Sequence, residues 1–188
     1  MRVGPLMVLI AGCALMLLPV AGNAQTDREV YWVKPGDVLR ISVWGEPDLQ
    51  DTVLVTPDGS FSFPLVGHVT TEEKTAAQLQ EIVTERLKKF ISEPAVSVAL
   101  QEINGNAIYV LGQVNSPGVF LLSRSVDVMQ ALSMAGGATP FAALNDILIL
   151  RRGDTGQVAL EFRYSDVSKG RNLEQNISLK SGDVVVVP

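Results

Sequence analysis

Three aspartates stand in glycine-containing turns, where a carboxylate could bind a cation or the hydroxyl groups of a sugar. They are Asp37, Asp58 and Asp183. An aspartate in a turn more often accepts hydrogen bonds from nearby backbone amides, so we interpret all three as structural. Two of these turns are nearly identical, because residues 34–38 read KPGDV and residues 180–184 read KSGDV. We call these the two echoed turns. We interpret each as the same kind of turn leading into a strand, and not as a sign of a repeat architecture.

Carboxylates also gather near Glu46, Asp48 and Asp51, and again at Glu72 and Glu73. A glycosidase places two carboxylates about 5–10 Å apart across a cleft, and nothing in the sequence indicates such a cleft. Solvation of polar loops is the better interpretation.

Other catalytic or metal centres are equally poorly supported. His68 is the single histidine, the only cysteine lies near the N-terminus, and no Gly-x-Ser-x-Gly nucleophile elbow occurs. We therefore predict no catalytic residues, no metal, no cofactor and no enzymatic activity.

Aromatic and basic side chains could contact a polymer. Tyr31, Trp32 and Trp44 could stack on sugar rings, although such residues more often pack in a core or at a subunit contact. Basic points at 151–152 and 169–171 could meet an anionic polymer or a partner's acidic patch, with solvated surface as the default.

The charge balance excludes one class of partner. The chain has 188 residues and a formal net charge of −5, and the first 24 residues carry only Arg2, so the remainder has 14 basic and 20 acidic residues. An acidic chain without a run of lysine or arginine does not favour nucleic-acid binding.

The first 24 residues have the layout of a secretory signal peptide. A charged Arg2 precedes an apolar stretch, Leu6–Val20, and the small residues Gly22 and Ala24 take the −3 and −1 positions before Gln25. Residues 10–13 (IAGC) also match the pattern for lipidation at Cys13. We favour cleavage near Ala24, because the apolar run continues past Cys13, and an uncleaved anchor is a third alternative. Each alternative places the body of the protein outside the cytoplasm.

The most strongly patterned stretch is Ala107–Pro140. It predicts a strand over 108–114, a type II turn with Pro117 and Gly118 at its centre, a second strand over 119–122, and a helix capped by Ser125. The apolar residues of this helix recur at helical spacing, and Gly136 and Gly137 end it.

Three further strands are predicted over 146–151, 157–162 and 183–187. Residues 184–187 are all valine, which predicts a central strand covered on both faces, beside 108–114 and parallel to it. Hairpin, helix and a terminal strand in the middle form a β-grasp plan.

The preceding residues predict a first α+β unit. Strands are expected over 38–44, 52–56 and 60–63, with a hairpin turn containing Asp58 and Gly59. A helix with a Thr75–Gln78 capping box follows, its apolar stripe reaching Phe90 and Ile91, and then a strand over 96–100. Residues 104–106 are the expected seam between the units.

In order and spacing, these motifs resemble the polysaccharide export family, the outer-membrane auxiliary proteins that include the Wza-type translocon. The motifs that carry the resemblance are Tyr31 with Pro35-Gly36-Asp37-Val38, Pro57-Asp58-Gly59 with Phe63-Pro64-Leu65-Val66-Gly67, Gly112-Gln113-Val114 with Pro117-Gly118, Gln130-Ala131-Leu132 with Ala135-Gly136-Gly137, and Gly182-Asp183-Val184 with the closing strand to Pro188. The resemblance implies a polysaccharide export domain over 29–102 and a soluble-ligand-binding β-grasp (SLBB-type) domain over 105–188, after a signal peptide over 1–24.

The resemblance also implies a role. Such proteins form ring-shaped oligomers that conduct or gate a capsular or exopolysaccharide in the periplasm of a Gram-negative bacterium, close to the outer membrane. Their partners are the exported polysaccharide and an inner-membrane copolymerase that is often linked to a tyrosine kinase. Larger relatives continue to a C-terminal membrane helix, so a short form ending at Pro188 is expected to need a separate pore protein.

Two alternatives to a ring subunit remain at this point. A monomeric periplasmic glycan-binding module would bind saccharide without forming a ring. An enzyme acting on the polymer would lose activity when Glu46 or Asp48 becomes an amide, and no catalytic constellation supports it.

Overall fold

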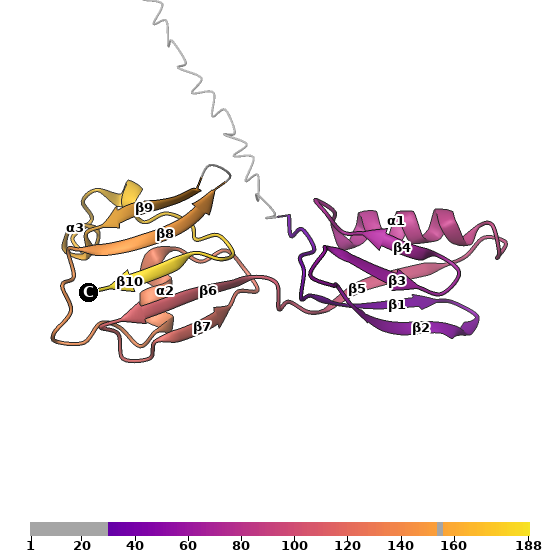
Figure 1. Cartoon of the computed structure of the whole chain (residues 1–188), viewed down its shortest axis with the longest axis horizontal. Helices are drawn as coiled ribbons and strands as arrows, with labels where there is room; N and C mark the ends of the chain where they lie inside the picture. The colour runs from indigo at the N-terminus through magenta and orange to yellow at the C-terminus, as the bar shows by residue number, and fades with distance from the viewer. Residues whose placement is uncertain (1–29, 154–155) are drawn as a thin grey trace, which may run out of the picture.

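The computed structural model describes residues 30–153 and 156–188 as two units that lie end to end (Figure 1). The predicted signal peptide over 1–24, including Cys13, lies outside the described residues. Each unit has its own buried apolar cluster. The fold class is α+β, as predicted.

The first unit is built on two small sheets and one helix. The strands β2 (Glu46–Leu54), β1 (Val38–Val43) and β5 (Val96–Glu102) form an antiparallel sheet in that order, while β3 (Ser60–Phe63) pairs with β4 (Gly67–Thr70). The helix α1 (Ala76–Leu87) buries Leu79, Val83 and Leu87. Its predicted capping box is confirmed, because Thr75 and Gln78 each bond the other's backbone amide.

Three expectations for this unit were wrong. The stretch after Gly45 is not a loop, because β2 begins at Glu46; its position at the sheet edge, with a bulge opposite β1, tolerates Pro47. The helix ends at Leu87 and leaves Phe90 exposed. The turn at Gly59 forms, but β3 then pairs with β4 and not with β2.

The second unit is a β-grasp arrangement in which the sheet order is β7-β6-β10-β8-β9. Its strands are β6 (Ala107–Gly112), β7 (Gly118–Leu121), β8 (Ile147–Gly153), β9 (Gly156–Phe162) and β10 (Val184–Val187). The terminal strand β10 is central and runs parallel to β6, as predicted. The helix α2 (Val128–Met134) packs on one face of this sheet, and the short helices α3 (Tyr164–Val167) and η1 (Leu173–Gln175) follow β9.

The second unit corrects three further expectations. The cap of α2 is Asp127, in a capping box with Gln130, and not Ser125. Gly118 does not have a positive φ at the centre of a type II turn, because it opens β7 opposite Val110. The chain instead leaves β6 at Gly112, which has a φ of +97°.

The third correction concerns the cover on β10. Val185 and Val187 are buried, but Val184 and Val186 on the other face are only half-buried, so β10 is covered on one face and not on both. The physical reason is that α2 covers a single side of the sheet, and no other element of the described residues lies on the second side.

Candidate functional site

The linker between the units is fixed by the first of the two echoed turns. The buried Asp37 carboxylate accepts hydrogen bonds from the Lys34 amide, the Tyr31 hydroxyl and the Gly105 amide, each at 2.8 Å. The first two bonds close the turn locally. The third reaches 68 residues along the chain, so Asp37 ties the first unit to the linker.

Further bonds tie the same linker to both units. The Lys34 ammonium donates to Asn106 Oδ1 at 2.7 Å, and the Asn106 amide nitrogen donates to the Leu122 carbonyl at 2.8 Å. From the second echoed turn, the Ser181 hydroxyl donates to the Gly105 carbonyl at 2.8 Å. Both turns therefore meet at the linker, a juxtaposition that their spacing in the sequence did not reveal.

We call the linker at 104–106 and the two echoed turns bonded to it the junction. Within it, Gly105 makes the closest approach to the first turn. A Cβ at this position would lie 2.5 Å from the Pro35 carbonyl oxygen and 2.6 Å from Lys34 Cβ. These distances are well inside van der Waals contact, so only glycine lets the linker pass here. The sequence indicated a seam at 104–106 but not the reason for its glycine.

We expect Gly105→Ala to destabilise the first unit by about 2 kcal/mol, because the added methyl group overpacks against backbone and weakens the bond to Asp37. Urea unfolding monitored by tryptophan fluorescence measures this, since both tryptophans, Trp32 and Trp44, lie in the first unit. Gly45→Asn is a suitable control, because the Cβ position of Gly45 is open and asparagine tolerates its φ of +82°. Equal midpoints for the two variants would contradict the close-approach explanation.

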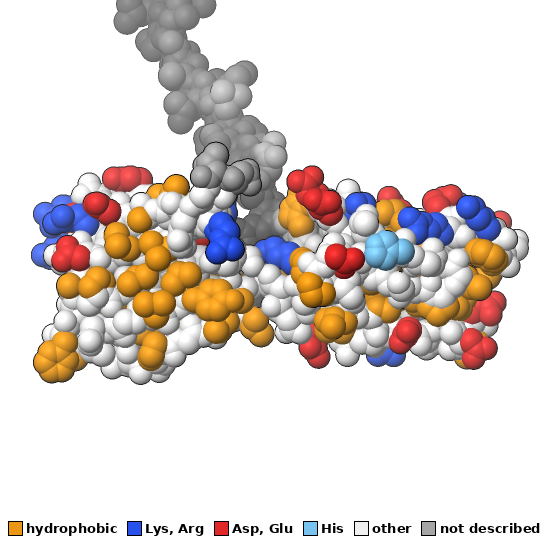
Figure 2. Space-filling model, viewed as in Figure 1, with side chains coloured by type: hydrophobic (Ala, Val, Ile, Leu, Met, Phe, Trp, Pro, Cys, Tyr) orange, Lys and Arg blue, Asp and Glu red, His pale blue; other side chains and the backbone are white. Residues whose placement is uncertain are grey.

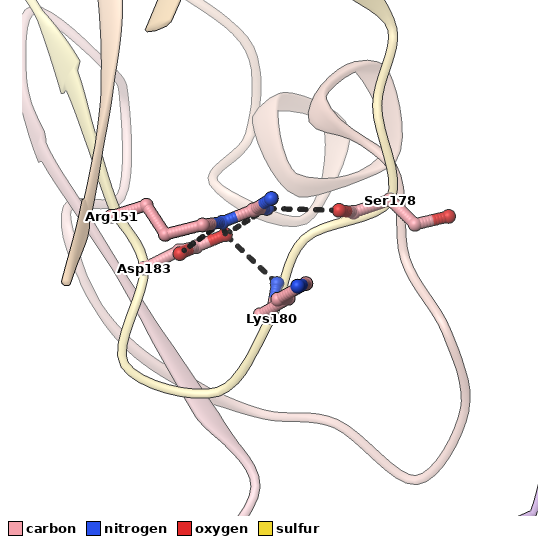
Figure 3. A network of polar contacts seen from close by, with 4 residues as sticks. All are labelled: Arg151, Ser178, Lys180 and Asp183. Carbon is pink, nitrogen blue, oxygen red and sulfur yellow. Dashed lines mark hydrogen bonds and ion pairs between the residues drawn. The ribbon is translucent and has the colours of Figure 1, made fainter. Parts of the chain in front are cut away.

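The second echoed turn holds a buried ion pair. The Asp183 carboxylate accepts two bonds from Arg151 Nε, at 3.0 and 3.2 Å, and one from Arg151 Nη2 at 2.6 Å. It also accepts the Lys180 amide at 2.8 Å, and Arg151 Nη2 donates to the Ser178 carbonyl at 3.0 Å (Figure 3). Arg151 therefore holds the turn on β8, and the expectation of a solvated surface arginine was wrong for this residue.

Burial and these contacts set the electrostatics of the junction. Burial, and then the hydrogen bond to Asp37, raises the pKa of the Tyr31 phenol well above its usual value, so its hydroxyl remains a donor at neutral pH. Burial lowers the pKa of the Lys34 ammonium, and the Asp37 charge opposes this effect. Hydrogen bonds from Arg151 to Asp183 raise the pKa of the guanidinium.

Asp58 lies apart from the junction, in the exposed turn before β3. It accepts hydrogen bonds from the Thr56 hydroxyl and, at 2.9 Å, from the Ser60 hydroxyl. The bond from Thr56, and then that from Ser60, lowers the pKa of Asp58. Its Oδ1 atom is thus engaged within its own turn.

The remaining carboxylates do not converge on one another. Glu46, Asp48 and Asp51 are spread along the edge strand β2, while Glu72 and Glu73 lie in the loop before α1. The described residues contain no group of three or more acidic, histidine or cysteine side chains placed to hold a metal ion. Likewise, none of the helices in residues 30–153 and 156–188 is long and apolar enough to cross a membrane.

The predicted aromatic side chains are separated. Tyr31 belongs to the junction, whereas Trp32 is partly exposed and Trp44 is fully exposed at the turn between β1 and β2.

Gly136 and Gly137 have φ values of +74° and +79° after α2, and their amides bond the carbonyls of Ser133 and Leu132 in a Schellman arrangement.

Comparison with known proteins finds a matching family model for each of the two units. Residues 25–101 match the model of the polysaccharide biosynthesis/export protein family, and residues 106–187 match that of the SLBB domain. The two matches follow one another across the junction and together span nearly all of the described residues. The chain belongs to the polysaccharide export family.

Relatives of this chain come from several bacteria. It is 32% identical over 171 residues to the capsule polysaccharide export outer membrane protein CtrA of Neisseria meningitidis, a match that covers 81% of this chain and 43% of CtrA. It is 28% identical over 125 residues to the polysialic acid transport protein KpsD of Escherichia coli, covering 66% of this chain and 22% of KpsD.

A third relative is the exopolysaccharide production protein ExoF of Rhizobium meliloti, 29% identical over 156 residues, with 76% of this chain and 34% of ExoF covered. The chain thus spans less than half the length of each of these three relatives.

Proposed function

We propose that this chain is a subunit of an apparatus that exports a capsular or exopolysaccharide, and that it acts as a ring-forming oligomer in the periplasm, associated with the outer membrane. The observation that carries the proposal is the tandem of an export domain and an SLBB domain. Relatives with export or outer membrane in their names support the same role and location. We also propose that the export domain spans residues 29–102 and that the SLBB-type domain spans residues 105–188.

The open face of the second sheet supports self-association. On this face β6 presents Tyr109 and Leu111, and β7 presents Val119, which pairs with Tyr109, and Leu121, which pairs with Ala107. The outward residues of β10 and β8 continue the face, and they are Val184, Val186, Leu148 and Leu150. Figure 2 shows hydrophobic side chains gathered over these strands. An apolar face of this extent is typical of a protein contact surface.

A ring contact on this face has a measurable consequence. We expect the mature chain, from Gln25 to Pro188, to form a discrete high-order oligomer in light scattering over a concentration series. We expect Leu111→Gln with Val119→Thr to shift it towards monomer, because both changes remove apolar area from the face without touching the buried core.

Phe141→Gln is the matched control, since Phe141 is an exposed apolar residue in the loop between α2 and β8. A monomer at every concentration would contradict self-association by the chain alone and favour the alternative of a glycan-binding module. A glycan pull-down with that monomer then tests the alternative directly.

The export role itself is tested in the native organism. Deletion of the gene is expected to remove the polysaccharide from the cell surface, with restoration by the intact gene. Unchanged surface polysaccharide would overturn the proposal. The copolymerase, its associated tyrosine kinase and a pore protein are the partners to seek by cross-linking in the same strain.

A further inference from the structure

A pocket of about 590 Å³ lies where the two units meet. Its lining comes from four segments: the turn at Tyr31 and Lys34, Asn106 of the linker, the loop between β7 and α2, and the turn that precedes β10. These segments are held in place by the bonds through Gly105 and Asn106. The pocket therefore takes its walls from both units, and these hydrogen bonds link the units beside it.

The pocket is positively charged within an acidic protein. Its lining includes Lys34, Arg124 and Lys180 and no aspartate or glutamate. The nearest carboxylates of the two echoed turns are buried and already bonded, Asp37 to Tyr31 and the backbone, and Asp183 to Arg151. Figure 2 shows lysine and arginine side chains at this junction. Three cations in one concavity favour an anion.

Neutral polar groups accompany the cations. Ser123, Ser181 and Asn106 line the pocket, and the Ser181 hydroxyl donates to the Gly105 carbonyl at 2.8 Å, which leaves its oxygen able to accept. The Tyr31 ring lies 5.7 Å from the Lys34 ammonium and, with Leu179, adds apolar surface. Hydroxyl and amide groups beside an aromatic ring suit a sugar better than they suit a bare inorganic anion.

We propose that this pocket binds an acidic saccharide, with the sugar carboxylate held by Lys34, Arg124 and Lys180 and the sugar hydroxyls held by the neighbouring serines and Asn106. The volume lies within the range of about 300–1,000 Å³ that small-molecule sites occupy. The inference rests on the proposed export function, and it assigns the recognition of charge on the saccharide to the junction between the two units.

The test uses calorimetric titration of the full chain with three probes: trigalacturonate, the neutral maltotriose, and inorganic phosphate. Trigalacturonate is expected to bind at least tenfold more tightly than either other probe, and more weakly as salt rises, because added ions screen charge contacts. The variant Arg124→Gln/Lys180→Gln is expected to lose at least tenfold in trigalacturonate affinity. Both side chains are exposed at the pocket, so the fold should survive.

The matched control is Arg152→Gln/Lys169→Gln, which removes the same charge from exposed positions that do not line the pocket. An equal loss in both double variants would overturn the proposal in favour of general charge attraction. Phosphate binding as tightly as trigalacturonate would overturn the saccharide assignment, and no binding of any probe would overturn the site. The export role is judged separately by gene deletion. If trigalacturonate does not bind as expected but gene deletion still removes the surface polysaccharide, only this inference is refuted.

Discussion

Gly112→Ala is expected to destabilise the second unit by about 3–5 kcal/mol, since overpacking and backbone strain add at this position. An alanine Cβ at this position would lie 1.9 Å from the carbonyl oxygen of Val187 and 2.8 Å from its carbonyl carbon. The obstructing atoms are backbone of the central strand β10, which cannot move aside as a flexible side chain could. The residue also has a φ of +97°, where a side chain adds conformational strain.

The effect should be confined to one unit, which makes it measurable. Far-UV circular dichroism follows both units, whereas tryptophan fluorescence follows only the first, where Trp32 and Trp44 lie. In urea, the dichroism of Gly112→Ala is expected to show an early transition that the fluorescence lacks. The loss is a large fraction of the roughly 5–15 kcal/mol that stabilises a domain.

Gly118→Ala is the control for this prediction. Gly118 lies in β7 without a positive φ, and a Cβ there would meet nothing within 4 Å. Its replacement should leave the dichroism transition in place or shift it slightly upward, because alanine loses less backbone entropy than glycine on folding. If Gly112→Ala and Gly118→Ala unfolded at the same urea concentration, the predicted clash at Gly112 would be refuted.

The second large effect is expected at Arg151, whose replacement by methionine should cost about 3 kcal/mol. Only 1% of the Asp183 side chain is exposed, so removing its partner leaves a buried carboxylate without the cation that neutralises it. The hydrogen bond from the Lys180 amide persists, but an uncharged donor does not replace a guanidinium. An uncompensated buried charge is far more costly than the loss of the ion pair itself. The same dichroism transition in urea measures the change.

Two further variants separate this explanation from a general loss of packing. Arg152→Met alters the adjacent but exposed residue and should leave the midpoint nearly unchanged. The double variant Arg151→Met/Asp183→Asn should recover part of the lost stability, because it removes the stranded charge as well. If the double variant were as unstable as the sum of both single changes, charge burial would not be the cause.

Local patterns predicted the elements well where neighbouring residues decide the outcome. The capping box at Thr75 and Gln78, the alternating residues of β1 and the valine strand β10 depend on spacing within a few residues, and each formed. The order of turn motifs also predicted the family that the two domain matches show.

Other features depended on contacts that local spacing does not encode. The cap of α2 is Asp127, in a capping box with Gln130, and not Ser125. The chain leaves β6 at Gly112, and the loop that follows is tied to the C-terminal end of α2 through the backbone amides of Asn115 and Ser116. Nothing near Arg151 in the sequence identified Asp183, which is 32 residues away, as its partner.

The sequence by itself determined the two units, their class and the two nearly identical turns that begin β1 and β10. Only the tertiary structure brought those turns to one linker, placed Gly105 against Pro35 and gathered Lys34, Arg124 and Lys180 around one pocket. The physical reason is the separation along the sequence. Helix caps, turns and side-chain periodicity depend on residues a few positions apart. The junction joins backbone groups and charges that are far apart in the chain, and the packing of the two units sets their proximity.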